Sequence, residues 1–210
     1  MNYHGQVGQD RWVDEQLLGK RNGVFVELGA QDGVIFSNTL FFEKHRGWKG
    51  LCIDANPSNA AKLQKNRKCI SYNCCVGAAP AEDVDFLQLT GYTEALSGIL
   101  SCFDERHKVR IERELNQHGG TKTIVKVPQR TITELCLESG FTKIDYFSLD
   151  VTGAELEVLK GLDFSQITVE IFSIENNYPD KFTPIHELLT TNGYTKVHEV
   201  YPDVFYRKTQ

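Results

Sequence analysis

Short apolar runs along this chain alternate with segments in which apolar residues recur every three or four positions. The mostly apolar run Val24–Leu28 leads into a glycine-rich turn, which is typical of a buried parallel strand. Similar runs predict further strands at Gly50–Asp54, Cys69–Val76, Tyr146–Val151 and Val169–Ile174. Because helical patterns separate these strands, the sequence predicts an α/β fold with a mainly parallel sheet and helices on both faces.

The segments between the strands carry the expected helix signals. Ser37 is suited to cap a helix that starts near Leu40, and the turn Asn56-Pro57-Ser58 precedes another. Further helices are predicted at Thr131–Ser139, Ala154–Leu159 and Pro184–Thr191. At the end of the chain, Tyr194–Glu199 and Val204–Tyr206 predict an antiparallel hairpin at one edge of the sheet.

The middle of the chain, residues 82–128, departs from this alternation. Strands at Val84–Leu89 and Thr123–Val127 are predicted to pair as an antiparallel insertion, with a loop at Gly91–Gly98. Between them, Asp104–Gln117 is charged, and one helical stripe runs through it, formed by Phe103, His107, Ile111 and Leu115. Such a charged helix suits either a solvated face or a lid over a substrate.

Length and composition limit the classes of protein. A chain of 210 residues suits one domain, 1–210, in which residues 1–22 form a helical lead-in. The net charge of -5 argues against a nucleic-acid partner, since phosphate binding favours clustered Lys and Arg. No apolar run is long enough for a membrane span, and the polar stretch 1–10 is no signal peptide, so a cytoplasmic location is expected.

The six cysteines do not form a metal-binding pattern. No C-x-x-C spacing occurs, so no metal site is expected. Several of the cysteines lie in apolar runs, where a free thiol packs as a small apolar side chain in a reducing compartment. They are Cys52, Cys69, Cys74, Cys75, Cys102 and Cys136.

Candidate ligand-binding residues follow the first two strands. The run Glu27-Leu28-Gly29-Ala30-Gln31-Asp32-Gly33 has glycines that let the backbone approach a ligand closely. Glu27 is expected to receive a cationic group such as the amine of a methionine moiety. Asp54 ends the second strand and is expected to accept hydrogen bonds from both hydroxyls of a ribose. Since ligands bind at the carboxyl ends of parallel strands, the pattern indicates an adenosine-containing ligand.

A dinucleotide is the competing ligand. Its G-x-G-x-x-G fingerprint, started at Gly29, would need glycine where Gln31 and Val34 stand. A ligand without phosphates fits this turn better. The alternative that the glycines only form a sharp turn, with Asp54 capping Asn56-Pro57, stays open.

Four segments together resemble the FkbM-type methyltransferases, and the resemblance extends from about Gln9 to Tyr206. The segments are Gln9-Asp10, Gly23–Gly33 with Ser37-Asn38-Thr39 after it, Trp48–Pro57, and Asp145–Val151. The resemblance implies the class I, Rossmann-like methyltransferase fold, S-adenosylmethionine as cofactor and, most often, O-methylation. The expected acceptor is a small molecule or glycan that bears a hydroxyl. The expected cofactor residues are Gln9, Asp10, Glu27, Gly29, Ala30, Asp32, Gly33, Ser37, Asn38, Asp54, Ala55, Asn56 and Asp150.

The chain departs from the family pattern at one place. The family usually has Asp-Val-Glu-Gly after the fourth main strand, and here the run is Asp150-Val151-Thr152-Gly153. A hydroxyl therefore replaces a carboxylate at the rim of the expected site. Two other functions follow as alternatives, namely a catalytically degenerate binding module, for which Thr152 would be the sign, and a nucleotide-dependent oxidoreductase.

A methyl transfer to a hydroxyl requires a group that takes up the proton. Asp150 and Glu175 end predicted strands and are the candidate catalytic residues. Their alternative roles are structural, with Asp150 capping the turn at Thr152 and Glu175 preceding an Asn176-Asn177 turn. His107 is expected to lie on a helix surface rather than to act as a base.

Asp54→Ala is expected to weaken S-adenosylmethionine binding about tenfold or more, because a hydrogen bond to a charged group contributes about 1.5–3 kcal/mol. Titration calorimetry with S-adenosylmethionine and S-adenosylhomocysteine measures the change. An unchanged affinity would remove Asp54 from the site.

Overall fold

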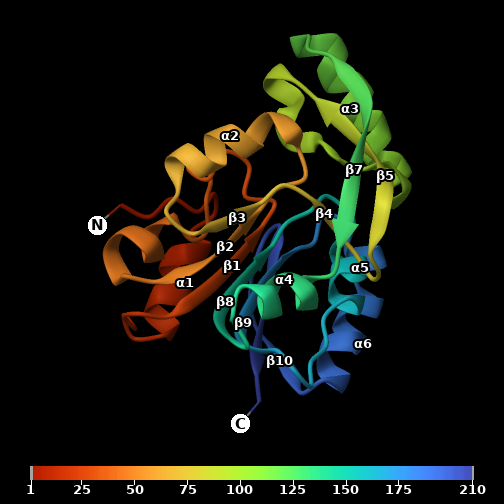
Figure 1. Ribbon diagram of the computed structural model, residues 1–210. Coiled ribbons are helices and arrows are strands. Elements are labelled where there is room, and N and C mark those ends of the chain that lie inside the picture. The colour runs from red at the N-terminus through yellow and green to blue at the C-terminus, as the bar shows by residue number, and fades with distance from the viewer. Residues whose placement is uncertain (1, 210) are drawn as a thin grey trace.

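The computed structural model describes residues 2–209 and contains a seven-stranded main sheet with the order β10-β11-β9-β8-β1-β2-β3 (Figure 1). Strands β1, β2, β3, β8 and β9 run parallel, and β11 is antiparallel to both β9 and β10. Their bounds are β1 Val24–Leu28, β2 Lys49–Ile53, β3 Ile70–Tyr72, β8 Lys143–Leu149, β9 Thr168–Glu175, β10 Tyr194–Val200 and β11 Asp203–Lys208. The predicted class I methyltransferase fold, with its antiparallel edge hairpin, is confirmed.

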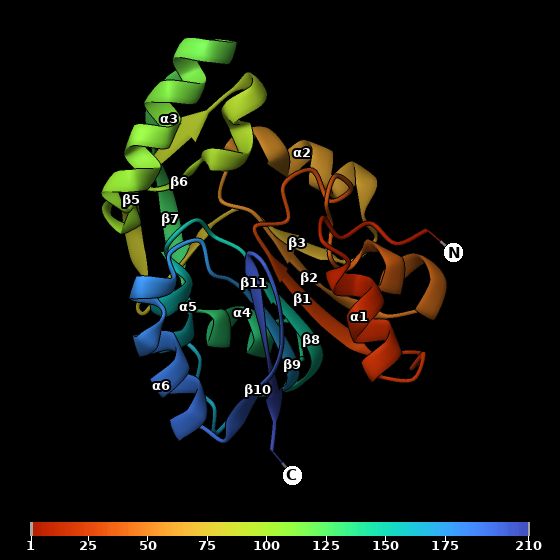
Figure 2. The ribbon, with the colours of Figure 1, turned by 180° about the vertical axis from the view of Figure 1, so that it is seen from behind.

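Helices cover both faces of this sheet (Figures 1 and 2). Alternate residues of β1 point to opposite faces, so Val26 packs in one apolar cluster and Phe25 in the other. The Val26 face is covered by α4 (Ile132–Glu138), α5 (Glu155–Lys160) and α6 (Thr183–Thr191). The Phe25 face is covered by α1 (Gln9–Gln16), the π-helical turn η1 (Phe42–Arg46) and α2 (Pro57–Asn66).

The insertion forms a second sheet beside the first, with the order β4-β7-β5-β6. Its strands β5 and β7 pair antiparallel, as predicted, and α3 packs against β5 through an apolar cluster that includes Leu89, Phe103 and Ile111. Figure 2 shows this unit projecting beside the main sheet. The bounds are β4 Cys75–Val76, β5 Ala81–Leu89, β6 Gly98–Ile99, β7 Lys122–Arg130, α3 Glu105–His118 and the short 3₁₀ helices η2 Gly91–Leu96 and η3 Leu100–Cys102. A further short 3₁₀ helix, η4 (Pro179–Lys181), lies between β9 and α6.

The prediction of one strand at Cys69–Val76 was wrong. The chain leaves the main sheet after Tyr72, where the Asn73 side chain donates to the carbonyl of Asp54 at 2.7 Å, and it enters the second sheet as β4. Cys74 and Cys75 consequently pack in different apolar clusters. A side-chain hydrogen bond to a neighbouring turn breaks the strand, and the apolar pattern carries no sign of that bond.

Two expectations for the insertion were also wrong. The predicted loop Gly91–Gly98 contains the 3₁₀ helix η2. His107 is only 3% exposed rather than on the helix surface, because the apolar stripe of α3 faces η2 and brings the imidazole Nε2 to 3.0 Å from the Leu96 carbonyl oxygen. Burial lowers the pKa of His107.

Neither a membrane helix nor a metal-ligand cluster occurs in the described part of the chain. Within residues 2–209 no helix is both long and apolar enough to cross a membrane. The same residues contain no group of three or more His, Cys, Asp or Glu side chains arranged to hold a metal ion.

Candidate active site

A cavity of about 400 Å³ opens at the carboxyl ends of β1, β2, β8 and β9. Residues from both sheets line it, so the insertion forms one of its walls. In open α/β sheets, ligands bind at the carboxyl ends of the strands, in the crevice where the strand order reverses direction. Of the residues expected from the sequence, the cavity is lined by Gln9, Glu27, Gly29, Ala30, Ser37, Asn38, Asp54, Ala55, Asn56, Asp150 and Glu175.

Gly29 brings the end of β1 against the end of β8. Its φ is +84°, and a Cβ at this position would lie 1.8 Å from the carbonyl oxygen of Asp150. The backbone N–H groups of Gly29 and Ala30 both donate to the carbonyl of Ile53, at 3.0 and 3.1 Å. Only glycine permits this close approach, which places the ends of three strands around one cavity.

Asp54 joins the loop after β1 to the turn after β2. Its carboxylate accepts hydrogen bonds from the N–H of Gln31 at 2.8 Å, the N–H of Asn56 at 3.0 Å and the side-chain amide of Asn59 at 3.2 Å. A carboxylate offers about four acceptor positions, so capacity for a ligand hydroxyl remains. Burial raises the pKa of Asp54.

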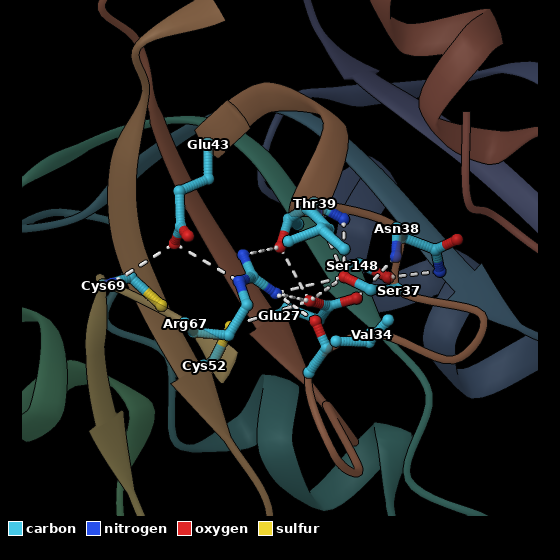
Figure 3. A network of polar contacts seen from close by, with 12 residues as sticks. Glu27, Val34, Ser37, Asn38, Thr39, Glu43, Cys52, Arg67, Cys69 and Ser148 are labelled. Carbon is cyan, nitrogen blue, oxygen red and sulfur yellow. Dashed lines mark hydrogen bonds and ion pairs between the residues drawn. The ribbon is translucent and has the colours of Figure 1, made fainter. Parts of the chain in front are cut away.

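Glu27 forms several hydrogen bonds and an ion pair within the protein (Figure 3). One carboxylate oxygen accepts from the N–H of Asn38 at 2.5 Å. The other accepts from the hydroxyls of Ser37 at 2.8 Å and Thr39 at 2.7 Å, and lies 3.0 Å from Nη1 of Arg67. Glu27 also lines the cavity, so the residue that holds the loop after β1 is part of the cavity wall.

Arg67 is the partner that the sequence analysis missed. Its side chain is 0% exposed and forms ion pairs with Glu27 and Glu43, the latter at 3.2 Å (Figure 3). Gly33 permits this position, since a Cβ there would lie 2.6 Å from Cγ of Arg67. Arg67 follows α2 and stands 40 residues after Glu27, so no local spacing links the two.

Two polar atoms at the cavity lack partners and fit an S-adenosylmethionine molecule. Within residues 2–209, the buried Oδ1 of Asn38 and Nδ2 of Asn56 have no hydrogen-bond partner, and both residues line the cavity. Buried polar groups normally have partners, so these two atoms are candidate contacts for a bound ligand. Oδ1 of Asn38 suits an ammonium donor, and Nδ2 of Asn56 suits a hydroxyl or ring-nitrogen acceptor.

Asp150 and Glu175 form a pair of interacting carboxyl groups in the cavity wall. Asp150 lines the cavity and is exposed to solvent. Desolvation by the surrounding protein raises the pKa of Asp150 to about 7. Burial and repulsion from Asp150 raise the pKa of Glu175 well above its usual range. Two carboxyl groups that resist ionising together can share a proton.

The turn after Asp150 is held by a different carboxylate. Glu155 accepts hydrogen bonds from the N–H groups of Val151 and Gly153, both at 3.1 Å. Thr152 lies between them with φ at +57°, an unfavourable conformation for a β-branched residue. Glu155 therefore performs the structural role that was considered for Asp150.

Three residues expected at the cofactor lie outside the cavity wall. Asp10 accepts from the N–H groups of His4 and Gly5, at 2.6 and 3.2 Å, and so shapes the N-terminal segment. Asp32 accepts from the N–H groups of Val34 and Ile35, both at 2.9 Å, within its own loop. Gly33 packs against Arg67.

Several wall residues were not expected from the sequence. They come from the N-terminal segment, β4, β8, the insertion and the β10–β11 turn. The only sequence signal for any of them was the lid considered for Asp104–Gln117. They include Gln6, Cys75, Glu94, Leu96, Ser97, His107, Arg110, Ser148 and Tyr201.

Arg67→Leu is expected to reduce the free energy of unfolding by about 3–5 kcal/mol, because it leaves the Glu27 and Glu43 carboxylates without their buried counter-ion. Urea denaturation followed by circular dichroism measures the loss. Arg11→Leu is the control, since the Arg11–Glu15 pair is exposed and contributes at most about 1 kcal/mol. Equal losses in the two variants would contradict the role given to Arg67.

Structural comparison finds methyltransferases with low sequence identity. Precorrin-6y C5,15-methyltransferase from Geobacter metallireducens has 11% identity and a TM-score of 0.48, covering 94% of this chain and 84% of that one. Human methyltransferase 10 domain containing protein has 11% identity and a TM-score of 0.47, with 98% and 83% covered. Ribosomal protein L11 methylase from Lactobacillus delbrueckii subsp. bulgaricus has 12% identity and a TM-score of 0.46, with 96% and 78% covered. Nothing about this chain's substrate follows from likeness at this level.

A comparison with curated proteins gives no match. The model of the methyltransferase FkbM domain matches residues 27–196, which is most of the chain and includes the Glu27 loop, Asp54, Asp150 and Glu175. The chain therefore belongs to the FkbM methyltransferase family, and it is an S-adenosylmethionine-dependent methyltransferase.

Proposed function

We propose that this methyltransferase acts on a hydroxyl oxygen of a small molecule or glycan, and that Asp150 and Glu175 are its catalytic residues. The observation that carries the proposal is the carboxyl pair in the cavity wall, in which the pKa of Asp150 is raised to about 7. A general base is most effective when its pKa lies near the working pH.

The cofactor supplies an activated methyl group. Oδ1 of Asn38 would accept a hydrogen bond from its ammonium group, and Asp54 would accept hydrogen bonds from its ribose hydroxyls. Nδ2 of Asn56 would donate a hydrogen bond to the nucleoside part. Gly29 and Ala30 let the backbone approach the ligand, and Ser37 and Gln9 complete this part of the wall.

The protein's own contribution to the reaction is to position the acceptor and take up its proton. With the cofactor bound, the acceptor oxygen would take the methyl group from the sulfonium, and the hydroxyl proton would pass to the ionised Asp150 carboxylate. The neighbouring Glu175 can share that proton because the two carboxyl groups interact. The carboxylates in the wall also attract a cationic cofactor and repel anionic acceptors.

The proposal includes a cytoplasmic location and excludes nucleic acid as the acceptor. All six cysteines are free thiols, as suits a reducing compartment. The net charge of -5 and the carboxylates around the cavity oppose a phosphate backbone.

A second candidate function is a module that binds the cofactor without transferring its methyl group. Thr152 favours it, since this residue stands where the family usually has a carboxylate. An assay of S-adenosylhomocysteine formation separates the two candidates. A non-catalytic module would bind S-adenosylhomocysteine but would not form it from S-adenosylmethionine.

Asp150→Asn is expected to lower methyl transfer roughly 10²- to 10⁴-fold, the usual contribution of a general base. In the unaltered protein, the rate should rise with pH through about 7, since Asp150 must be ionised to accept a proton. The measurement is S-adenosylhomocysteine formation with cyclohexanol, phenol and methyl glucoside as acceptors. Asp83→Asn, an exposed carboxylate outside the cavity wall, is the control. A full rate in Asp150→Asn would refute the assignment.

Thermal unfolding gives a test that needs no acceptor. The pKa of Asp150 is near 4 in the unfolded chain and about 7 in the folded protein. Between these two pH values, its ionisation lowers the free energy of unfolding as the pH rises. Asp150→Asn removes this loss of stability. The melting temperature of the variant minus that of the unaltered protein should therefore be larger at pH 8 than at pH 5. A pH-independent difference would show that the Asp150 pKa is not raised.

A further inference from the structure

Three large apolar side chains stand exposed around the mouth of the cavity. Ile35 and Phe36, in the loop after β1, are 57% and 55% exposed, and Tyr201, in the β10–β11 turn, is 74% exposed. All three line the cavity although the two segments are far apart in the sequence. Exposed apolar side chains that gather around a binding cavity are typical of a ligand-contacting surface.

Phe36 is held in this position at a conformational cost. Its φ is +55°, in the left-handed region that a bulky residue rarely adopts. The side chain belongs to none of the apolar core clusters, so core packing does not offset this cost. Strained residues that the surrounding structure holds in place concentrate at ligand sites.

Hydrogen bonds and strand pairing place the Ile35–Phe36 loop and the turn with Tyr201 beside Asp150 and Glu175. On one side, Asn38, two residues after Phe36, donates to the Ser148 hydroxyl at 2.9 Å, and Ser148 precedes Asp150 by two residues. On the other side, Asp203 is the register partner of Glu175. The N–H of Asn176 donates to the carbonyl of Pro202 at 2.8 Å, which fixes the turn that carries Tyr201.

We propose that Ile35, Phe36 and Tyr201 form the acceptor subsite, and that the acceptor is an alcohol whose hydroxyl is carried on an apolar ring or chain. The apolar body would cover these side chains while its hydroxyl reaches Asp150 and Glu175. This assignment rests on the proposed O-methylation and names its substrate class. The three apolar side chains line the same cavity as Asp150 and Glu175, so we assign the methyl acceptor as the molecule that contacts them. The carboxylates of the wall favour an acceptor without negative charge.

Cyclohexanol and myo-inositol test this substrate class, because they share a six-membered carbon ring and differ in the number of hydroxyls. Ligand-observed NMR titration of the protein loaded with S-adenosylhomocysteine gives the affinity for each. Cyclohexanol is expected to bind at least about tenfold more tightly, a difference of about 1.4 kcal/mol. Equal affinity, a preference for inositol or no binding of cyclohexanol would overturn the proposal.

Substitutions test the named side chains. Phe36→Ala and Tyr201→Ala are each expected to weaken cyclohexanol binding at least fivefold. Tyr92→Ala is the matched control, since Tyr92 is 68% exposed and does not line the cavity. Unchanged cyclohexanol binding in both cavity variants would remove these residues from the subsite.

Phe36→Gly separates a role in binding from a role in folding. Glycine adopts φ +55° without strain, so this variant should unfold at a temperature no lower than the unaltered protein while losing cyclohexanol binding. A lower unfolding temperature with cyclohexanol binding retained would show that Phe36 serves the fold.

The proposed function can fail separately from this subsite. Calorimetry of S-adenosylhomocysteine binding is performed on every variant and is expected to be unchanged in Phe36→Ala and Tyr201→Ala. Cyclohexanol binding without S-adenosylhomocysteine formation would support the subsite and refute the proposed O-methylation. Transfer to methyl glucoside or inositol without transfer to cyclohexanol would support O-methylation and refute the apolar acceptor.

Discussion

The buried ion pair between Arg67 and Glu27 is the contact on which the geometry of the site depends. A charged group removed from water is tolerated only when its hydrogen-bonding capacity is met by the protein. Each nitrogen of the Arg67 guanidinium has an acceptor, supplied by Glu27, Glu43, Thr39, Ser37 or the Gly33 carbonyl. These acceptors come from β1, η1 and the loop between them, so satisfying one buried cation fixes the path of the whole loop.

That fixed loop holds Asn38 and Asn56, each with a buried unpartnered polar atom, in the cavity wall. The Glu27 carboxylate holds the N–H of Asn38, and Ser148 accepts from the Asn38 amide, which leaves Oδ1 of the same side chain without a partner. On the neighbouring strand, Asp54 holds the N–H of Asn56, whose Nδ2 is likewise unpartnered. Rigid support of this kind orients binding groups before the ligand arrives, which lowers the entropy lost on binding.

The same region concentrates features that lower the stability of the fold. Enclosure raises the pKa of Asp150 to about 7, so its ionised form is disfavoured in the folded protein at neutral pH. Gln31, Phe36 and Thr152 all have positive φ and all line the cavity. Positive φ in residues other than glycine costs free energy that the core must offset, and its concentration around one cavity fits a site shaped for binding and catalysis.

The amino-acid sequence by itself determined the order of strands and helices, the glycine-rich turn, the acidic residues at the strand ends and the family. These features are local, because apolar periodicity and turn residues act over a few positions. Tertiary structure decided which side chains meet. It paired Glu27 with Arg67, divided Cys69–Val76 between two sheets, buried His107 and brought Phe36 and Tyr201 to one cavity. Each of these outcomes depends on contacts between segments far apart in the chain, for which local sequence patterns carry no signal.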